Sequence, residues 1–385
     1  MAPAIKFWFA GQKYLVAFGA IYLLVVVLLT IPYFQSHVLF LNAVRLPFFA
    51  NFDTPEKYGL APNRTINLRL QTPDNESIGA WFVLSERYYL NFPDIPTNPA
   101  EHIAPALKQK PVILFLHGNA ATRAFTARVR TYEMLSSRLG ANILAIDYRG
   151  FADSTGYPSE DGLVIDSRTA FDWLVSQGKK PEDILVIGHS LGTGVSGQLA
   201  AQLSAEHITP RGFVLLSPFS SIAEVLETYN MFGFVPLIKP IAIIPGAAQL
   251  VKNAVIHRFD TLQAVPNITS SVLIVHSEDD WDIPDSHSDV LFQAFLDPHL
   301  PAMAKFDSLV PNTEDWEKFT AERDEREKKR KELVKTKTIP NFGRVDSFAA
   351  DGRTVTLLKS LYGGHDYIAV QEGVVDIIGR TFGLL

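Results

Sequence analysis

Short apolar runs alternate with longer segments of helical character through the middle of the chain. The apolar runs of strand length are residues 111–116, 142–147, 183–188 and 212–217. The intervening helical segments are residues 121–139, 162–177 and 191–203. Continuous apolar strands that alternate with helices predict a mostly parallel central sheet with helices on both faces, an α/β fold. Two further strand-like runs, residues 65–70 and 79–84, flank a Pro-Asp-Asn-Glu turn and predict an antiparallel hairpin at the start of the sheet.

The N-terminal part of the chain carries a long uncharged stretch. Residues 14–34 form 21 consecutive positions without a charge. As a helix, such a stretch can cross about 30 Å of hydrocarbon, so we expect a transmembrane signal anchor after a short N-terminus of residues 1–13. Lys6 and Lys13 precede the span without any acid, which favours a cytosolic N-terminus and a lumenal catalytic domain in the endoplasmic reticulum. A cleaved signal peptide is the alternative, although residues 30–34 offer no small-x-small cleavage site.

The segment that follows, residues 35–64, is expected to be a juxtamembrane linker. Its apolar part, residues 39–49, is interrupted by Asn42, Arg45 and Pro47. We expect this part to lie along the membrane surface, or else to pack as a linker against the catalytic domain.

Two segments stand out within the predicted catalytic domain of residues 65–385. Residues 228–251 contain a single charge and three prolines, and we interpret them as the centre of an apolar cap of about residues 222–260. Such a surface suits a lid that lines an apolar pocket and leans on the bilayer, the alternative being a cap that packs over the core. Residues 314–337 mix both signs of charge at helical spacing, which predicts a solvated surface helix within an insert of about residues 312–338.

Composition narrows the classes of partner and chemistry. The formal net charge of −6 argues against a nucleic-acid partner. The absence of cysteine excludes disulfides, thiolate metal sites and a cysteine nucleophile. Three Asn-x-Ser/Thr triplets would suit a lumenal domain, and the candidate glycosylation sites are Asn63, Asn75 and Asn267, of which Asn75 lies in the predicted hairpin turn.

The apolar run of residues 184–187 leads directly into the sequence Gly-His-Ser-Leu-Gly, with the serine at position 190. A buried strand that feeds into Gly-x-Ser-x-Gly is the arrangement of a nucleophile elbow. Ser190 would sit on a strained turn between strand and helix. Gly188 and Gly192 would be needed beside it because strand and helix pass close to each other there.

Three further polar motifs follow predicted strands. His117-Gly118-Asn119 comes after residues 111–116, where a loop can donate backbone N–H groups to an oxyanion. Acidic residues at 279, 280 and 282 follow the apolar run 272–275, and His365 follows two glycines after the run 354–358. Because the carboxyl ends of parallel strands meet at one edge of a sheet, we expect these motifs to meet there.

In this order the motifs, together with Asp-Tyr-Arg-Gly at residues 147–150, resemble those of the serine hydrolases of the α/β-hydrolase fold over roughly residues 65–385. Within that superfamily the chain is most similar to the membrane-anchored lysophosphatidylserine and monoacylglycerol lipases. The resemblance implies a triad of nucleophile, base and orienting acid: Ser190, His365 and Asp280. It also implies that the backbone N–H groups of Asn119 and Leu191 form the oxyanion hole.

Alternatives exist for the acid and for the base. Asp280 fits the Asp-x-x-Ile/Val-Pro pattern of the resemblance, whereas physical reasoning alone leaves Asp279 and Asp282 nearly equal to it. His189 and His276 are other candidate bases, but the first is constrained inside the elbow and the second suits packing at a strand end. Asp147 precedes the nucleophile and is expected to hydrogen-bond within its own loop.

The expected reaction is the hydrolysis of long-chain acyl esters of single-chain lipids, such as lysophospholipids or monoacylglycerols, at a membrane. A charge placed at Phe234 or Ile243 of the apolar cap would then impair hydrolysis of long-chain substrates. A protein depalmitoylating thioesterase and a catalytically silent membrane-tethered interaction module are the alternatives. No cofactor is expected, and His287-Ser288-Asp289 lacks the spacing of a metal site, so no metal is expected either.

Overall fold

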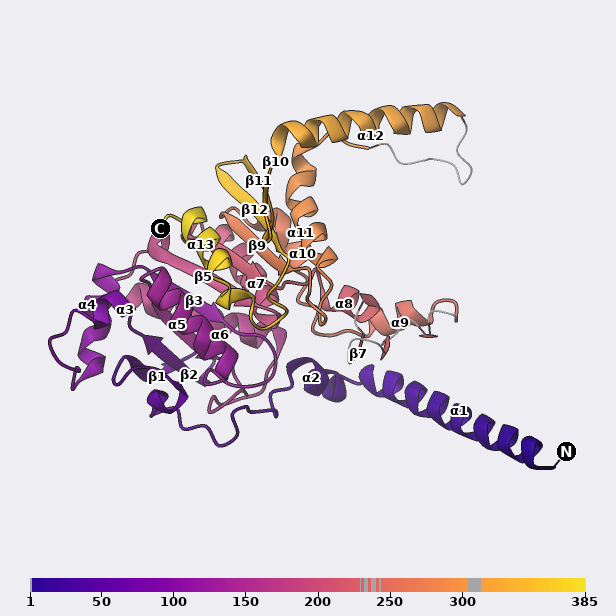
Figure 1. Cartoon of the computed structure of the whole chain (residues 1–385), viewed down its shortest axis with the longest axis horizontal. Helices are drawn as coiled ribbons and strands as arrows, with labels where there is room; N and C mark the ends of the chain where they lie inside the picture. The colour runs from indigo at the N-terminus through magenta and orange to yellow at the C-terminus, as the bar shows by residue number, and fades with distance from the viewer. Residues whose placement is uncertain (1, 229, 232–234, 237–239, 242–243, 304–312) are drawn as a thin grey trace.

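The computed structural model of the chain describes residues 2–228, 230–231, 235–236, 240–241, 244–303 and 313–385. Its centre is a ten-stranded sheet in the order β1-β2-β4-β3-β5-β6-β9-β12-β11-β10 (Figure 1). These strands are β1 (Thr65–Gln71), β2 (Ser77–Val83), β3 (Val112–Leu116), β4 (Asn142–Asp147), β5 (Ile184–His189), β6 (Gly212–Leu216), β9 (Val272–Ser277), β10 (Lys335–Ile339), β11 (Gly343–Ala350) and β12 (Arg353–Ser360).

The six central strands, from β4 to β12 in this order, are all parallel, which confirms the predicted mostly parallel sheet. The predicted hairpin is also present, because β1 and β2 pair antiparallel at one edge. The opposite edge was not predicted: β11 and β10 extend the sheet by two antiparallel strands. The expected charged insert ran to residue 338 and therefore overlapped β10, whose Lys-Thr-Lys-Thr sequence is exposed and lacks the apolar run of a central strand.

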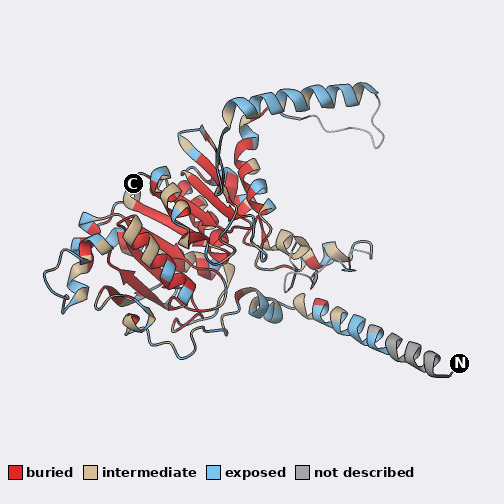
Figure 2. Cartoon of the chain, in the orientation of Figure 1, coloured by how far each residue is buried: buried red, intermediate tan, exposed pale blue. Residues whose placement is uncertain are grey.

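Helices cover both faces of the sheet, and successive residues of each strand alternate between the two cores. On β5, Ile184 and Val186 join the core under α6 (Glu160–Ser176), α7 (Leu191–Ala205) and α11 (Ser286–Leu296). Leu185 and Ile187 join the core under α5 (Thr126–Arg138) and α13 (Glu372–Thr381). Figure 2 shows the resulting buried interior along the central strands. The polar groups at the carboxyl ends of these strands are thus held by a rigid frame.

The remaining elements are short or lie outside these layers. The α-helices are α3 (Glu86–Tyr89), α4 (Ile103–Gln109), α8 (Ile222–Thr228), α9 (Ala247–Asn253), α10 (Thr261–Ala264) and α12 (Thr313–Leu333), and the two-residue strands β7 (Asn230–Met231) and β8 (Val235–Pro236) pair with each other. The 3-10 helices are η1 (Pro55–Tyr58), η2 (Pro99–His102), η3 (Pro181–Asp183), η5 (Val265–Asn267), η6 (Asp297–His299) and η7 (Ile368–Val370).

The N-terminal region forms two helices where a single span over residues 14–34 was expected. They are α1 (Ala2–Leu29) and α2 (Pro32–Phe40). The break has a local cause, because proline lacks an N–H and drives the preceding residue out of the helical region, and Ile31 is accordingly extended, with φ −89° and ψ 125°. Among the described residues, no single helix has the length and hydropathy to cross a bilayer. Residues 16–29 and 32–40 have that length and hydropathy only when taken together, as two helices bent by 93° relative to each other.

The two predicted insertions differ in how they meet the body of the molecule. The helix α12 projects from the body as an exposed arm, as Figures 1 and 2 show, in agreement with the predicted solvated helix. The cap region lies beside α1, where Val26 packs with Ile241 and Val251 in a small separate apolar cluster. Phe234 and Ile243, the cap positions singled out in the sequence, lie outside the described residues.

Candidate active site

The turn between β5 and α7 is strained at Ser190, whose backbone has φ 51° and ψ −118°. This conformation is rare for a residue with a side chain and is maintained only where the surroundings enforce it. The flanking glycines explain how the turn is made. A Cβ atom at Gly192 would lie 2.1 Å from the carbonyl oxygen of Leu116, and one at Gly188 would lie 2.3 Å from that of Gly192. Strand and helix therefore pass too close for any side chain at either position, as the sequence predicted.

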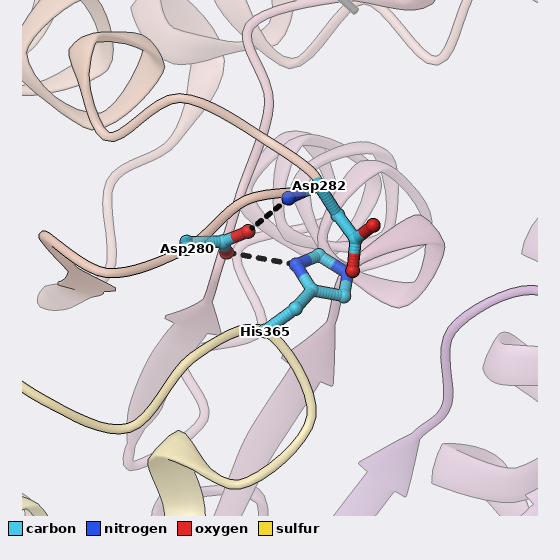
Figure 3. Close-up of side chains that lie close together, drawn as sticks. All are labelled: Asp280, Asp282 and His365. Carbon is cyan, nitrogen blue, oxygen red and sulfur yellow. Dashed lines mark hydrogen bonds and ion pairs between the residues drawn. The ribbon is translucent and has the colours of Figure 1, made fainter. Parts of the chain in front are cut away.

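The structure brings Ser190, His365 and Asp280 into one chain of hydrogen bonds. The Nε2 atom of His365 lies 2.9 Å from Ser190 Oγ. Its Nδ1 atom lies 2.8 Å from Asp280 Oδ2, as Figure 3 shows. Because a carboxylate can only accept, Nδ1 carries the proton, and Nε2 is free to accept the hydrogen bond of the serine hydroxyl. This is the tautomer that a base for Ser190 requires.

The carboxylate of Asp280 is completely buried and is held by four groups. Oδ1 accepts the backbone N–H groups of Asp282 and Ile283, each at 2.9 Å. Oδ2 faces His365 and also lies 3.3 Å from Nε2 of His276. Burial opposes the ionised form, but the hydrogen bonds from His276 and His365 outweigh it and hold the pKa of Asp280 well below its ordinary value. Asp280 is therefore a fixed negative charge beside the imidazole.

His276, an alternative base in the sequence, supports the acid instead. It is fully buried at the end of β9, and its Nδ1 atom lies 2.7 Å from the hydroxyl of Ser288. Its single Nε2–H is shared between the carbonyl oxygen of Ile283, at 3.0 Å, and Asp280 Oδ2, at 3.3 Å. The ring of His276 thus links α11, through Ser288, to the acid loop, through Ile283, and orients this loop.

The neighbouring acids Asp279 and Asp282 occupy other positions. Asp279 accepts the backbone N–H of Gly364 at 2.7 Å, so it fastens the loop that carries His365 and does not contact the imidazole. Asp282 is exposed, and its carboxylate lies beside the ring of His365 in Figure 3. Burial lowers the pKa of His365, but the hydrogen bond and charge of Asp280, with the charges of Asp282 and Asp366, outweigh burial and raise it above its ordinary value.

The same cluster is the one grouping of ligand-type side chains, among the residues described, that has the spacing of a metal site. Ligand atoms of Asp280, Asp282 and His365 lie within 4.8 Å of one another. Both nitrogens of His365 are already engaged, one by Asp280 and one by Ser190. A cation could bind there only by displacing one of these hydrogen bonds, so the arrangement fits a proton relay better than a metal centre.

His189, the other alternative base, positions the loop of His365. Burial and the nearby charge of His365 lower the pKa of His189 to about 4, so it is neutral near pH 7. Its Nε2 atom donates to the carbonyl oxygen of His365 at 2.8 Å, and Ser217 Oγ lies 3.4 Å from the same oxygen. Three strand ends, those of β5, β6 and β9, therefore hold the short loop that presents the imidazole.

Neither the backbone N–H of Asn119 nor that of Leu191 has an acceptor in the described part of the chain. Leu191 is the first residue of α7, where the N–H group points out of the helix end. Asn119 follows Gly118, and a Cβ atom at Gly118 would lie 3.1 Å from Cβ of Ser190. The two residues that the resemblance assigned to the oxyanion hole thus carry unpaired donors on either side of the serine.

The carbonyl groups of the loop around Asn119 converge on one buried arginine. Nη2 of Arg128, on α5, donates to the carbonyl oxygens of Gly118, Asn119 and Ala120 at 3.2, 3.0 and 2.9 Å. Since C=O and N–H of a trans peptide point in opposite directions, a fixed Gly118 carbonyl fixes the direction of the Asn119 N–H. Nothing in the sequence singled out Arg128, because the three carbonyls that it contacts are backbone groups.

Asp147 lies at the end of β4, away from the triad. It is fully buried, accepts from the backbone and the guanidinium of Arg123 at 2.8 and 2.6 Å, and lies 3.2 Å from Nε2 of His117. Its role is structural, as expected, but its main partner is Arg123, ahead of α5, and not a group of its own loop.

The three candidate glycosylation sites differ in exposure. Asn75 is exposed at the turn between β1 and β2, and Asn267 is exposed in η5. Asn63 is half-buried, and its side-chain amide donates to the carbonyl oxygen of Pro96 at 2.9 Å. Only the first two have a side chain free to be modified.

Comparison with known proteins agrees with this geometry. The family model described as "Alpha/beta hydrolase family" matches residues 113–334, which include Ser190 and Asp280. The chain is 34% identical to the lysophosphatidylserine lipase ABHD12 of Xenopus tropicalis over 72% of its length and 70% of the relative's. It is 33% identical to that of Rattus norvegicus, over 72% of this chain and 68% of the relative. The human protein ABHD12B is 30% identical over 66% of this chain and 68% of the relative.

Among solved structures, an alpha-beta hydrolase from Vibrio vulnificus has a similar fold, with a TM-score of 0.56. The match covers 91% of this chain and 92% of that one, at 16% sequence identity.

Proposed function

The chain belongs to the alpha/beta hydrolase family, and we propose that it is a membrane-associated serine hydrolase that cleaves long-chain acyl esters of lysophospholipids. The relatives that are about a third identical over the aligned part of the chain are named lysophosphatidylserine lipases, which makes lysophosphatidylserine the leading substrate. The observation that carries the reaction class is the hydrogen-bonded chain from Ser190 through His365 to Asp280.

The mechanism follows from the position of each group. His365 Nε2 takes the proton of Ser190 as Oγ attacks the ester carbonyl, because a serine hydroxyl is a weak nucleophile without a base. Asp280 stabilises the imidazolium that forms. The N–H groups of Asn119 and Leu191 bind the oxyanion, and each such donor contributes on the order of 3 kcal/mol at comparable sites. His365 then protonates the leaving alcohol, and water releases the fatty acid from Ser190 by the reverse sequence of proton transfers.

The membrane part of the proposal rests on the exposed apolar residues of the N-terminal helices and the cap. In α1, Phe18 and Leu24 are 77% and 57% exposed, and in α9 Leu250 is 71% exposed. A protein in water rarely leaves so many large apolar side chains uncovered in neighbouring helices. We infer that α1, α2 and α9 contact the bilayer, with the N-terminus cytosolic and the catalytic domain in the lumen of the endoplasmic reticulum.

The experiment that tests this function combines active-site labelling with lipid hydrolysis by the full chain in vesicles. The wild-type protein should react with a fluorophosphonate probe, and it should release fatty acid from long-chain lysophosphatidylserine faster than from palmitoyl thioester peptide. Ser190→Ala should abolish both reactions. A protein that does not react with the probe would be a silent module, and one that prefers the thioester would be a depalmitoylating enzyme.

A matched pair of variants tests the identity of the acid. Asp280→Asn should lower kcat by on the order of 10⁴-fold, because the amide stabilises neither the required tautomer nor the imidazolium. Asp279→Asn should retain most activity, because Asp279 contacts the backbone of Gly364 and not the imidazole. The reverse outcome would assign the acid to Asp279.

A further inference from the structure

The loop that carries Asn119 is strained next to the oxyanion donor. Ala120 and Ala121 both have φ of 52°, a left-handed conformation that residues with a Cβ atom seldom adopt. Two such residues in succession persist only where neighbouring groups hold them. Since neither residue is a glycine, this conformation is unfavourable for the loop itself, and contacts from outside the loop must stabilise it.

The groups that hold the loop come from the N-terminal segment. Residues 39–46, here called the strap, begin with the last two residues of α2 and run across the loop toward η1. The N–H groups of Ala120 and Ala121 donate to the carbonyl oxygens of Phe40 and Val44, at 2.9 and 2.6 Å. The N–H of Thr122 donates to Leu46 O at 3.0 Å, and so does its hydroxyl. Three successive residues after Asn119 therefore depend on strap carbonyls for their hydrogen bonds.

The strap is itself fixed at two points. Phe40 is fully buried and packs edge-on against Phe259, at a centroid distance of 6.2 Å. The side-chain amide of Asn42 donates to Gly150 O, beyond β4, at 2.9 Å. The strap is thus attached to the body of the molecule independently of the contacts that it makes with the loop.

We propose that residues 39–46 are a positioning element of the active site, which holds the loop of residues 119–122 in the strained conformation that presents the Asn119 N–H to the oxyanion. The inference rests on the proposed function, because it takes Asn119 as an oxyanion donor. Arg128 binds the carbonyl oxygen of Asn119, and the strap accepts the N–H of Ala120, so the two hold opposite ends of the peptide that follows the Asn119 N–H. A loosened strap weakens binding of the transition state and leaves substrate binding nearly unchanged.

The test uses the full chain and a short soluble ester, p-nitrophenyl butyrate, so that membrane binding does not enter. Thr122→Val keeps the shape of the side chain but removes the hydroxyl, which donates to Leu46 O and accepts the N–H of Ala124, whereas Thr122→Ser keeps both bonds. Asn42→Ala releases the strap from Gly150 without touching the loop. Phe49→Ala, a change of a fully exposed aromatic just beyond the strap, is the control.

Removal of a whole oxyanion donor costs about 10²–10³-fold in kcat, so partial misplacement by Thr122→Val should cost about tenfold. We expect a smaller loss of kcat for Asn42→Ala, with KM within about twofold of wild type for both variants. Fluorophosphonate labelling should slow in parallel, because that reaction also places charge on an oxygen in the hole. The acidic limb of the pH profile should not move, because His365 is untouched, and Thr122→Ser and Phe49→Ala should behave as wild type.

Two results would overturn the inference. One is wild-type kcat in both Thr122→Val and Asn42→Ala. The other is a loss of activity that follows the fraction of unfolded protein, measured by thermal melting of each variant. If the wild-type protein neither hydrolyses the ester nor reacts with the probe, the proposed function itself fails, and the role of the strap fails with it.

Discussion

At the scale of single residues, the site balances burial against charge around one imidazole. His365 must be neutral to accept the proton of Ser190, yet Asp280, Asp282 and Asp366 all favour its charged form. Asp280 is buried and in direct contact, so its effect cannot be removed without loss of the orienting hydrogen bond. Asp282 is exposed and acts through its charge, so it offers a way to change the pKa of His365 alone.

Asp282→Asn should shift the acidic limb of kcat/KM to lower pH. Asp282 raises the pKa of His365, so removal of this charge lowers that pKa, and the neutral base then persists to more acidic pH. The backbone N–H of residue 282 still donates to Asp280, so kcat at the plateau should be nearly unchanged. The pH dependence of soluble-ester hydrolysis measures the shift, which should shrink at high salt because the carboxylate is exposed. Asp324→Asn, on the remote α12, makes the same change in net charge and should leave the profile in place.

Arg128→Met should lower kcat by up to about 10²-fold while KM changes little, because three loop carbonyls lose their shared donor and the Asn119 N–H is no longer held. The buried acceptors left without a partner should also cost about 1–3 kcal/mol of unfolding free energy, measured by urea denaturation. Arg130→Met, an exposed change on the same helix, is the control. An Arg128→Met enzyme with wild-type kcat would show that the loop does not depend on the guanidinium.

At the scale of helices and strands, the sequence predicted those elements that a short, local pattern of residues indicates. Apolar runs located the central strands, and Gly-His-Ser-Leu-Gly located the elbow, because each reflects burial or close packing at that point in the chain. The edge strands β10 and β11 escaped prediction, because strands that are partly exposed need no continuous apolar run. The roles of Arg128 and the strap could not be foreseen, since they arise from contacts with backbone groups that the fold brings near. His276 packs at a strand end as expected, but its support of Asp280 depends on groups that only the fold brings together.

The helix α9 is the described part of the cap that is best suited to a test of membrane contact. Leu250→Asp should reduce hydrolysis of long-chain lysophospholipid in vesicles and leave hydrolysis of a short soluble ester unchanged. Burial of a leucine side chain is worth about 1.5–3 kcal/mol, which corresponds to roughly a ten- to hundredfold loss of partitioning into the bilayer. The side chain is 71% exposed, so the melting temperature should not change. Gln249→Asp adds the same charge at an exposed polar position of this helix, and an equal effect of both variants would argue against apolar contact.

At the scale of the whole molecule, the N-terminal region is joined both to the cap region and to the loop of Asn119. Gln35, on α2, donates to Ala254 O at 3.2 Å and accepts from the N–H of Ile256 at 2.8 Å, so it fastens α2 to the end of the cap region. The strap continues from α2 to the loop of Asn119. The segment expected to lie along the membrane surface or to pack as a linker is thus packed against the catalytic domain. If α1 and α2 lie in the bilayer, these contacts would hold the cap region and the loop of Asn119 at a fixed distance from the membrane surface.

This arrangement leads to a prediction about topology. The full chain in microsomes should resist extraction by alkaline carbonate, because α1 exposes apolar side chains that suit the bilayer. If the catalytic domain is lumenal, glycosidase treatment should increase its mobility. Asn75→Gln should remove part of this shift, because Asn75 is exposed at the β1–β2 turn. Asn63→Gln should leave the shift unchanged, because the Asn63 amide is engaged by Pro96. Digestion of the catalytic domain by protease added to sealed, right-side-out microsomes would place the domain in the cytosol instead. That result would favour a depalmitoylating thioesterase over a lysophospholipid hydrolase.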